Sequence, residues 1–420
     1  MIKWNIYTPE GVQDLMFREC SIKRTIEKKT IDLFDKRGFL EIQPPTIEFY
    51  DVFSGQSAGI SQESMFKFFD QQGRILVLRP DLTTSAARIA ATKPIQFPKP
   101  WRFSYIGNVF RFEGAGDGKL NQREFTQAGI EILGSLQPES DAEIISTIIN
   151  GIKNAGIQEF QIELGQVEFF KGLMEEAQFT EEESETIREF IENKDFISLE
   201  NELNNKKLKD KLKQIILEIP QMFGAPDIIK DIYDRVENTR SKLALDNLKN
   251  ICEILNDYNI EKYINIDLGM VQSIDYYTGM IFRGLTRGVG STICGGGRYD
   301  NLTSDFGETM PAVGGAIGIN RLMLALNRQN IKMELPEIDT VISYMPNERK
   351  TAIQVAEELR KQGLIVEMSL SPGDVEHTKE YALAKSIKGF IMIKDTGVLE
   401  VHDLIANQIQ ITSVDELIKS

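Results

Sequence analysis

Two neighbouring segments, VFRFE and EFTQAGIEIL, place charged and amide side chains on what we expect to be one face of a β-hairpin. Every second side chain of a strand lies on the same face, so Arg111 and Glu113 share a face in the first segment. Gln127 and Glu131 share a face in the second segment, where the alternate positions are mostly apolar. Carboxylates accept hydrogen bonds from ammonium groups, and arginine holds phosphate or carboxylate. The pattern predicts a site for a small charged molecule or, as the alternative, a solvated sheet face with ordinary ion pairs.

Metal and covalent chemistry have few candidate residues. The only histidines are His377 and His402, and the three cysteines, Cys20, Cys252 and Cys294, are far apart and include no CxxC pair. These features argue against a Cys/His metal site and a histidine-based triad. They also argue against a disulfide framework and fit a reducing compartment. The glycine-rich segment GAGDGKLNQ is neither a dinucleotide fingerprint nor a P-loop, so we expect no metal and no cofactor.

Charge and hydropathy narrow the classes of partner. The 420 residues include 48 Lys and Arg against 63 Asp and Glu, which gives a net charge of −15 and a pI near 4.9. Binding of nucleic acid requires cations that neutralise phosphates, so tRNA is a less expected partner, although an acidic total can include a local basic face. The sequence has no run of about 18 apolar residues for a membrane span and no secretion signal at its start. We therefore expect a cytoplasmic protein that binds no membrane.

The elements that must position the polar face belong to an α+β fold of two or more domains. Apolar residues at helical spacing predict a first helix that stops at Gly38, and short strands separated by Gly and Pro follow to about residue 135. A stretch rich in Glu, Lys and Leu then predicts a helical insertion, after which strands return. The expected helices and helical stretch are 18–37, 140–155, 167–256 and a region near 316–328.

The C-terminal part has a different pattern. Beyond a linker around Pro336, strands alternate with helices through DTVISY, ERKTAIQVAEELRKQG, LIVEMS and GFIMIK. Such alternation predicts a small, mostly parallel α/β domain over 337–420.

Six ordered motifs carry a resemblance that spans essentially the whole chain. VFRFE with QREFTQAGIEILG resembles motif 2 of class II aminoacyl-tRNA synthetases of the histidyl branch, GFLEIQPPTIE resembles motif 1, and AVGGAIGINRLMLAL resembles motif 3. LRPDLTTSAARIA resembles the stretch that holds the amino acid, and MVQSIDYYTGMIF and CGGGRYDNL resemble the two histidine-specific signatures. The resemblance implies a class II core over 1–330, with an antiparallel sheet flanked by helices and the insertion at 167–256. It also implies that 337–420 is an anticodon-binding-like domain.

The resemblance further implies a pocket for free histidine. Positions that match the family's ligands for the amino group and neighbouring atoms are Asp81, Thr83 and Gln127, and positions that match the imidazole end are Glu131, Tyr276 and Tyr277. Arg111 and Gln272 complete the expected histidine-binding set. Arg111, Glu113 and Arg321 match positions that hold ATP phosphates, so they are candidates for residual nucleotide binding.

Several positions depart from the synthetase pattern. Gln272 replaces an arginine that stabilises charge during adenylate formation, and loss of one such donor costs roughly 10²–10³ in rate. Asn320 replaces the usual glutamate before the motif 3 arginine, and Thr126 replaces the histidine before the motif 2 glutamine. The motif 2 loop offers only Lys119 and Arg123 as cations, and residues 336–420 hold nine Lys and Arg against fourteen Asp and Glu. These changes predict loss of both charging chemistry and tRNA binding.

A retained histidine pocket without synthetase chemistry resembles the regulatory subunits of ATP phosphoribosyltransferase, the first enzyme of histidine biosynthesis. That resemblance implies no catalytic residues, a hetero-oligomer with the short-form catalytic subunit, and feedback inhibition by histidine as the allosteric ligand. It also implies a homodimeric building block around Pro44 and Pro45. Two alternatives stay open. A divergent, active histidyl-tRNA synthetase is favoured by Arg111, Arg321 and the retained C-terminal domain, and a stand-alone amino-acid sensor is compatible with the same fold.

Overall fold

The computed structural model describes residues 4–55, 59–112, 122–271, 276–394, 398–414 and 416. The chain divides into two compact units, Met1–Met333 and Glu334–Ser420. Within the described ranges, no helix combines the length and the apolarity that a membrane crossing requires.

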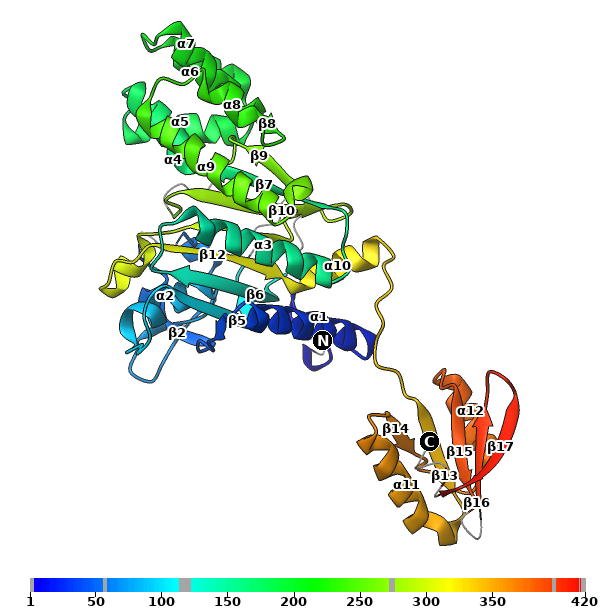
Figure 1. Cartoon of the computed structure of the whole chain (residues 1–420). Helices are drawn as coiled ribbons and strands as arrows, with labels where there is room; N and C mark the ends of the chain where they lie inside the picture. Colours follow the sequence, from blue (N-terminus) through cyan, green and yellow to red (C-terminus); the bar gives the residue numbers. More distant parts are fainter. Residues whose placement is uncertain are drawn as a thin grey trace. The chain divides into compact units, whose positions relative to one another are not determined.

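A nine-stranded sheet forms the centre of the first unit (Figure 1). Adjacent strands are antiparallel except for two parallel pairs, β1 with β5 and β7 with β9. In sheet order the strands are β1 (Leu40–Glu41), β5 (Trp101–Phe110), β6 (Glu124–Leu133), β12 (Ala312–Gly318), β11 (Cys294–Arg298), β10 (Met280–Thr286), β7 (Phe160–Gln166), β9 (Ile264–Asp267) and β8 (Phe223–Gly224). The expected hairpin is β5–β6, and the expected mainly antiparallel sheet flanked by helices is confirmed.

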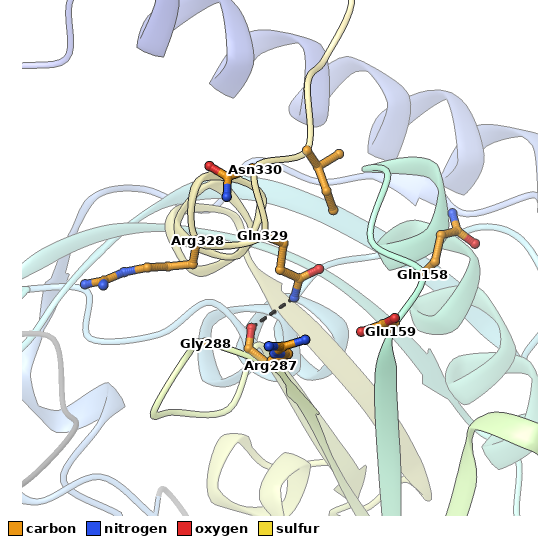
Figure 2. Close-up of a pocket in the computed structure, with 8 residues that line it drawn as sticks. Gln158, Glu159, Arg287, Gly288, Arg328, Gln329 and Asn330 are labelled. Atoms are coloured by element: carbon orange, nitrogen blue, oxygen red, sulfur yellow. Dashed lines mark hydrogen bonds between the residues drawn. The ribbon is translucent and has the colours of Figure 1, made fainter.

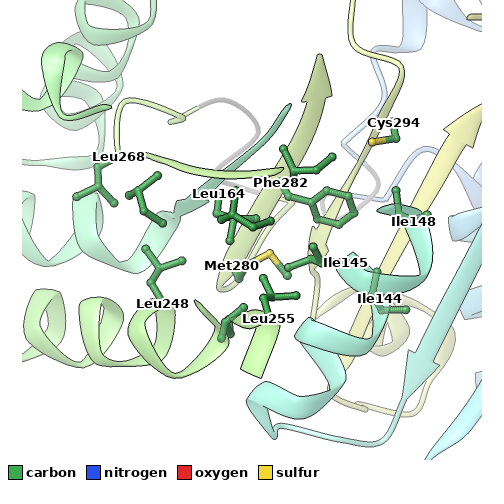
Figure 3. Packing of buried hydrophobic residues seen from close by; sticks show 14 of the residues in the cluster. Ile144, Ile145, Ile148, Leu164, Leu248, Leu255, Leu268, Met280, Phe282 and Cys294 are labelled. Atoms are coloured by element: carbon green, nitrogen blue, oxygen red, sulfur yellow. The ribbon is translucent and has the colours of Figure 1, made fainter. Parts of the chain in front are cut away.

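Three helices cover one face of this sheet: α1 (Arg18–Lys36), α3 (Pro138–Asn154) and α10 (Ile319–Arg328). Isoleucines of α3 pack against β10, as Figure 3 shows for Ile144, Ile145 and Ile148 beside Phe282 and Met280. Alternate residues of β6, such as Ile130, are fully buried in the same core. Because side chains alternate across a strand, Glu131 lies on the opposite face of the sheet. The core therefore fixes which face is free to form a site.

Helix α2 (Thr83–Thr92) was not expected, because residues 38–135 were predicted to form only short strands. Its buried face consists largely of small residues, including Ala86, Ala87 and Ala90. A face of this kind lacks the large apolar residues that mark a helix in sequence, and burial by its neighbours supplies the stabilisation instead. The helix begins two residues after Asp81 and packs against the 3₁₀ helix η6 (Leu302–Phe306).

A small three-stranded sheet in the order β2 (Ile47–Phe49), β4 (Ile75–Leu78), β3 (Lys67–Phe69) accompanies this part of the unit. Its link to α2 is an ion pair, in which Arg88 Nη2 lies 2.7 Å from Glu48 Oε1. Both side chains are largely buried, so this pair joins β2 and α2 more firmly than a surface ion pair would.

Helices dominate the stretch from 167 to 257. They are α4 (Val167–Glu176), α5 (Glu181–Glu192), α6 (Phe196–Asn204), α7 (Asp210–Glu218), α8 (Ile228–Tyr233) and α9 (Thr239–Asp257). Helix α9 packs against α4 and α3, which ties this stretch to the core. Thr180 and Glu183 form a capping box at the start of α5, which satisfies two backbone N–H groups that the helix leaves open.

The second unit has a five-stranded sheet with one helix on each face. In sheet order its strands are β14 (Val366–Met368), β13 (Thr340–Tyr344), β15 (Gly389–Ile393), β16 (Val398–Asp403) and β17 (Gln408–Ser413). Ile342 packs with α11 (Arg349–Lys361), and its neighbour Val341 packs with α12 (Val375–Ala384). The prediction of a mostly parallel sheet is wrong for this unit, because β15–β16 and β16–β17 are antiparallel. The hairpin β16–β17 follows the segment in which strands and helices alternate, and it adds two antiparallel pairs to the two parallel ones.

Candidate functional site

A cavity of about 660 Å³ lies on the face of the large sheet opposite the α1–α3–α10 core. Its lining combines the start of α2, the β5–β6 hairpin, two adjacent tyrosines and a glycine-rich floor from β11 and β12. The lining residues include six of the expected histidine-binding positions, namely Asp81, Thr83, Arg111, Gln127, Tyr276 and Tyr277, together with Thr292, Tyr299, Gly295, Gly297 and Gly314.

Glu131, the expected ligand of the imidazole end, does not line the cavity but lies directly behind the lining residues Tyr299 and Gly314. Its side chain has no solvent-exposed area. Tyr105 donates its hydroxyl to Glu131 Oε1 at 2.7 Å, and the hydroxyl of Tyr299 donates to Oε2. The alternative of a solvated face is therefore wrong at Glu131, which is instead a buried carboxyl with two tyrosine donors.

Two glycines make room for this arrangement. Gly129 lies directly opposite Tyr105 in the β5–β6 ladder, and a Cβ at Gly129 would lie 2.5 Å from atoms of the Tyr105 ring. A Cβ at Gly314, on the adjacent strand β12, would lie 1.4 Å from Glu131 Oε2. Only glycine is compatible with the observed positions of these side chains.

Burial raises the pKa of Glu131 from 4.5 to about 7, although the hydrogen bonds from Tyr299, Tyr105 and Thr83 oppose the shift. Burial likewise raises the pKa of Tyr105 and of Tyr299 well above the ordinary value, and the nearby Glu131 charge adds to both shifts. The tyrosines therefore stay protonated and act as donors, while the carboxyl can gain or lose a proton near neutral pH.

Asp81 provides an acidic group in the cavity just before α2, and Thr83 at the start of that helix lines the cavity beside it. The backbone N–H of Thr84 donates to Asp81 Oδ1 at 3.1 Å. Burial raises the pKa of Asp81, and the hydrogen bond from Thr84 and the charge of Arg111 oppose this change. The Thr83 hydroxyl lies 3.1 Å from the Tyr105 hydroxyl, so a chain of polar contacts connects the start of α2 to Glu131.

Gln127, Tyr276 and Tyr277 complete the polar wall. The Oε1 atom of Gln127 is buried without a hydrogen-bond partner among the described residues. A buried acceptor without a donor costs about 1–3 kcal/mol, so this atom suits a ligand that brings an N–H group. The ring of Tyr276 packs edge-on against Tyr277 at 4.7 Å and stacks on Tyr299 at 5.7 Å, measured between ring centroids.

Arg111 and Arg321 lie over one aromatic ring. The guanidinium carbon of Arg111 is 4.8 Å from the Phe125 ring centroid, and that of Arg321 is 5.9 Å from it. Arg111 Nη1 donates to Pro80 O at 3.4 Å, and Arg321 Nη1 donates to Thr292 O at 2.8 Å. Arg111 lines the cavity beside Thr292, whereas Arg321 reaches the cavity wall through Thr292.

Two further candidates, Glu113 and Gln272, fall outside the described residues. So does the part of the motif 2 loop that contains Lys119. Their expected roles stay predictions.

The departures Thr126 and Asn320 contact each other. The Thr126 backbone N–H donates to Asn320 Oδ1 at 2.8 Å, and the Thr126 hydroxyl donates to Asn108 Oδ1 at 2.7 Å. Two positions that differ from the synthetase pattern therefore form one local hydrogen-bonded unit between β6 and α10.

Three contributors to the site were missed in the sequence: Tyr105, Tyr299 and Gly314. Tyr105 is six residues before Arg111, so the same alternation that grouped Arg111 with the polar face also applies to Tyr105. Tyr299 belongs to the motif CGGGRYDNL, but no spacing signal relates it to Glu131, which is 168 residues away. Gly314 contributes by the absence of a side chain, and its role becomes visible only from the contact with Glu131.

Another hollow, of about 490 Å³, lies at the end of α10 and is lined by Gln158, Glu159, Arg287, Gly288, Arg328, Gln329, Asn330 and Ile331. Figure 2 shows Arg328 extending away from Arg287. Gln329 is occupied by a hydrogen bond from its Nε2 to Arg287 O at 2.9 Å. This hollow contains none of the predicted site residues, and its two arginines do not converge, so the glycine-floored cavity is the stronger candidate.

The chain is similar to known proteins along its whole length. Residues 11–322 match the family model for histidyl-tRNA synthetase. The chain is 50% identical to an ATP phosphoribosyltransferase regulatory subunit of Acetivibrio thermocellus and 47% identical to one of Ruminiclostridium cellulolyticum, each alignment covering 100% of both chains.

Solved structures show the same fold. A Bacillus halodurans protein described as an ATP phosphoribosyltransferase regulatory subunit/histidyl-tRNA synthetase matches with a TM-score of 0.81 and 27% identity, over 93% of this chain and 99% of that one. The histidyl-tRNA synthetase of Nostoc sp. matches with a TM-score of 0.83 at 22% identity, over 99% of both chains. This second likeness concerns the fold alone.

Proposed function

The chain belongs to the family of ATP phosphoribosyltransferase regulatory subunits, within the histidyl-tRNA synthetase fold, and we propose that its glycine-floored cavity binds free histidine as the regulatory signal. The observation that carries this proposal is the nearness of two acidic groups, with Asp81 lining the cavity and Glu131 buried directly behind its lining residues Tyr299 and Gly314. A ligand that suits both must bring two separate N–H-bearing ends. Histidine has an ammonium group and an imidazole ring, which meet this requirement.

The cavity offers a partner for each part of the ligand. Asp81 and the open Oε1 of Gln127 suit the ammonium group, because a charge-assisted hydrogen bond is stronger than a neutral one. Glu131 suits an imidazole N–H, with Tyr277 as one wall of the ring pocket. Arg111 suits the ligand carboxylate. We include Thr83, Tyr276 and Gln272 in the proposed set.

The regulatory role follows from differential binding. Histidine controls the catalytic chains if it binds one state of the assembly better than the other, and a coupling of about 1–3 kcal/mol is sufficient. We propose that the partner is the short-form catalytic subunit and that bound histidine inhibits it. The subunit itself is proposed to supply no catalytic residue.

A homodimeric building block is proposed through the small sheet β2–β4–β3. One face of this sheet is apolar and partly open, with Ile47 50% exposed and Phe49 44% exposed. The strand register places Leu76 and Leu78 on the same face. Arg79 Nη1 donates to Pro44 O at 2.7 Å and fixes the preceding turn. Exposed apolar side chains on one sheet face support the proposed interface.

The second candidate function is a divergent histidyl-tRNA synthetase. It is favoured by Arg111 and Arg321 at Phe125, an arrangement suited to a nucleotide. Against it stand Gln272, the thinned motif 2 loop and the acidic region 337–420, which is still proposed as an anticodon-binding-like domain. We therefore propose that tRNA is not a partner. Histidine-dependent exchange between ATP and pyrophosphate would establish the synthetase instead.

The test combines binding and reconstitution. Titration calorimetry should show one histidine bound per chain, and mixing with a short-form catalytic subunit should give transferase activity that histidine inhibits. Glu131→Gln should weaken inhibition more than assembly, and Glu139→Gln, an exposed glutamate of α3, is the matched control. A catalytic chain that works equally well and equally insensitively to histidine without this subunit would contradict the proposal.

A further inference from the structure

The edge strands of the described sheets are protected in different ways. An exposed strand edge presents unpaired backbone groups to other chains, and proteins guard such edges by short length, charge or capping. The edges β1 and β8 have two residues each, and β2 and β3 have three residues each, with Glu48 on β2 and Lys67 on β3. At β14, Arg360 Nη2 donates to Val366 O at 2.7 Å and Glu367 adds a charge. None of these edges is both long and uncharged.

Strand β17 is neither short nor charged along its length, and only its last residue is capped, where Glu416 Oε2 accepts the Ser413 N–H at 3.3 Å. It has six residues, Gln408–Ser413, and none of them is ionisable. Figure 1 shows β17, in red, as the last strand of the second unit's sheet. On its inner side β17 pairs with β16, and within the described ranges no strand pairs with its outer side.

Two exposed isoleucines on β17 lie beside His402 and Glu400 of β16 on one face of the sheet. Ile409 lies opposite His402, and His402 stacks on the buried Phe390 with ring centroids 4.1 Å apart. Phe390 belongs to the cluster that α12 covers, but Ile409 is 61% exposed and Ile411 is 70% exposed. The strand therefore presents open backbone groups together with uncovered apolar side chains.

The sequence of β17 is complementary to itself in one antiparallel register. A two-fold axis through Gln410 places Ile409 of one chain opposite Ile411 of the other, on both sides of the axis. Gln408 then lies opposite Thr412, and Gln410 lies opposite its own copy. Opposed β-branched residues stabilise a strand pair, and no like charges are brought together. Shifting the register by one residue would place glutamine opposite isoleucine.

We propose that β17 pairs antiparallel with β17 of a second copy of this chain, so that two five-stranded sheets become continuous. Such a contact uses the same patch on both copies and closes after two chains, as a two-fold interface must. It is separate from the face proposed at β2–β4–β3 and does not depend on histidine binding.

Cysteine cross-linking tests this register. In a Cys20→Ser background, Gln410→Cys places two cysteines directly opposite each other, with a Cα–Cα distance of about 4.5–5.5 Å, within the range for a disulfide. The matched control is Gln408→Cys, whose two copies would lie four residues apart, or about 13 Å along the strand. Mild oxidation should cross-link at least about five times more of the first variant than of the second. Equal cross-linking of the two, or none, would overturn the proposal.

Charge substitution provides a second test on the full chain. Ile409→Lys with Ile411→Lys places charges on side chains that are already exposed, so the fold should persist. The mass measured by sedimentation should fall twofold, and histidine binding should stay unchanged. If the mass does not change, or if β17 amides become protected from hydrogen exchange only when the catalytic subunit is added, the occupant is not a second copy and the inference is wrong.

Discussion

At one end of the cavity Glu131 is fully buried and held by the hydroxyls of Tyr105 and Tyr299, whereas at the other end Arg111 and Arg321 donate to backbone carbonyl groups. The carboxylate end depends on particular side chains and on glycines that leave room for them. The arginine end combines backbone carbonyl acceptors with the Phe125 ring, over which both guanidinium groups lie. We therefore expect the carboxylate end to be specialised for one ligand, while Arg321, which does not line the cavity, can be lost without disturbing that ligand's site.

The largest effect is expected at the carboxylate end from Gly314→Ala. Because the added Cβ would lie 1.4 Å from Glu131 Oε2, the carboxylate must move away from its observed position. We expect at least about a 100-fold loss of histidine affinity, equivalent to roughly 2.7 kcal/mol, measured by calorimetry. Gly318→Ala, on the same strand but outside the cavity lining, is the control, since a Cβ there meets only the flexible Arg321 side chain at 3.3 Å. Equal losses in both variants would show that the effect is not specific to Glu131.

Glu131→Gln should follow, with about a 10- to 100-fold loss of affinity. The amide keeps the shape of the side chain but replaces a charge-assisted hydrogen bond, worth about 1.5–3 kcal/mol, by a neutral one. A Glu131→Gln protein that binds histidine as well as the parent would remove Glu131 from the ligand site.

A change of pH should alter affinity by about tenfold or less. Below pH 7 the buried carboxyl is protonated, because burial raises its pKa to about 7, and free imidazole is protonated below about 6.5. In the complex the Glu131 carboxyl and the ligand imidazole share one proton, whereas at low pH each free group carries its own. Binding therefore releases one proton, and the affinity for histidine rises from pH 5.5 to 7. Calorimetry in buffers of different ionisation enthalpy measures that proton, and affinity that is constant over this range would contradict the assignment.

The same shift has a consequence for stability. The folded-state pKa lies above the ordinary value of 4.5, so the unfolded chain ionises first as pH rises. The ligand-free protein should therefore lose stability between pH 4.5 and about 7, and Glu131→Gln should reduce that loss.

The smallest effect is expected from Arg321→Ala. Its guanidinium contacts Thr292 O and Phe125 at the arginine end. We expect less than about a threefold change in histidine affinity, with any loss confined to nucleotide binding. A large loss of histidine affinity would mean that the two ends act as one unit and would break the comparison.

Sequence patterns predicted the strands that carry Arg111, Gln127 and Glu131, because period-two alternation and motif order are local properties. They did not predict that Tyr299 bonds to Glu131, since that contact depends on how β11 and β12 pair with β6. Helix α2 was missed because its buried face is built of alanines. The hairpin β16–β17 was missed because the preceding alternation of strand and helix favoured parallel pairing. Glu113 and Gln272 stay predictions.

The buried ion pair between Arg88 and Glu48 joins the middle of α2 to strand β2. Thr83, at the start of this ten-residue helix, lines the cavity, and Arg88 binds the strand that carries Ile47 and Phe49. Thr83 and Arg88 are five residues apart, a rise of about 7.5 Å along the helix. We expect that a ligand that tilts the start of α2 also moves the strand that Arg88 holds, so that occupancy of the cavity alters the geometry of the small sheet's apolar face.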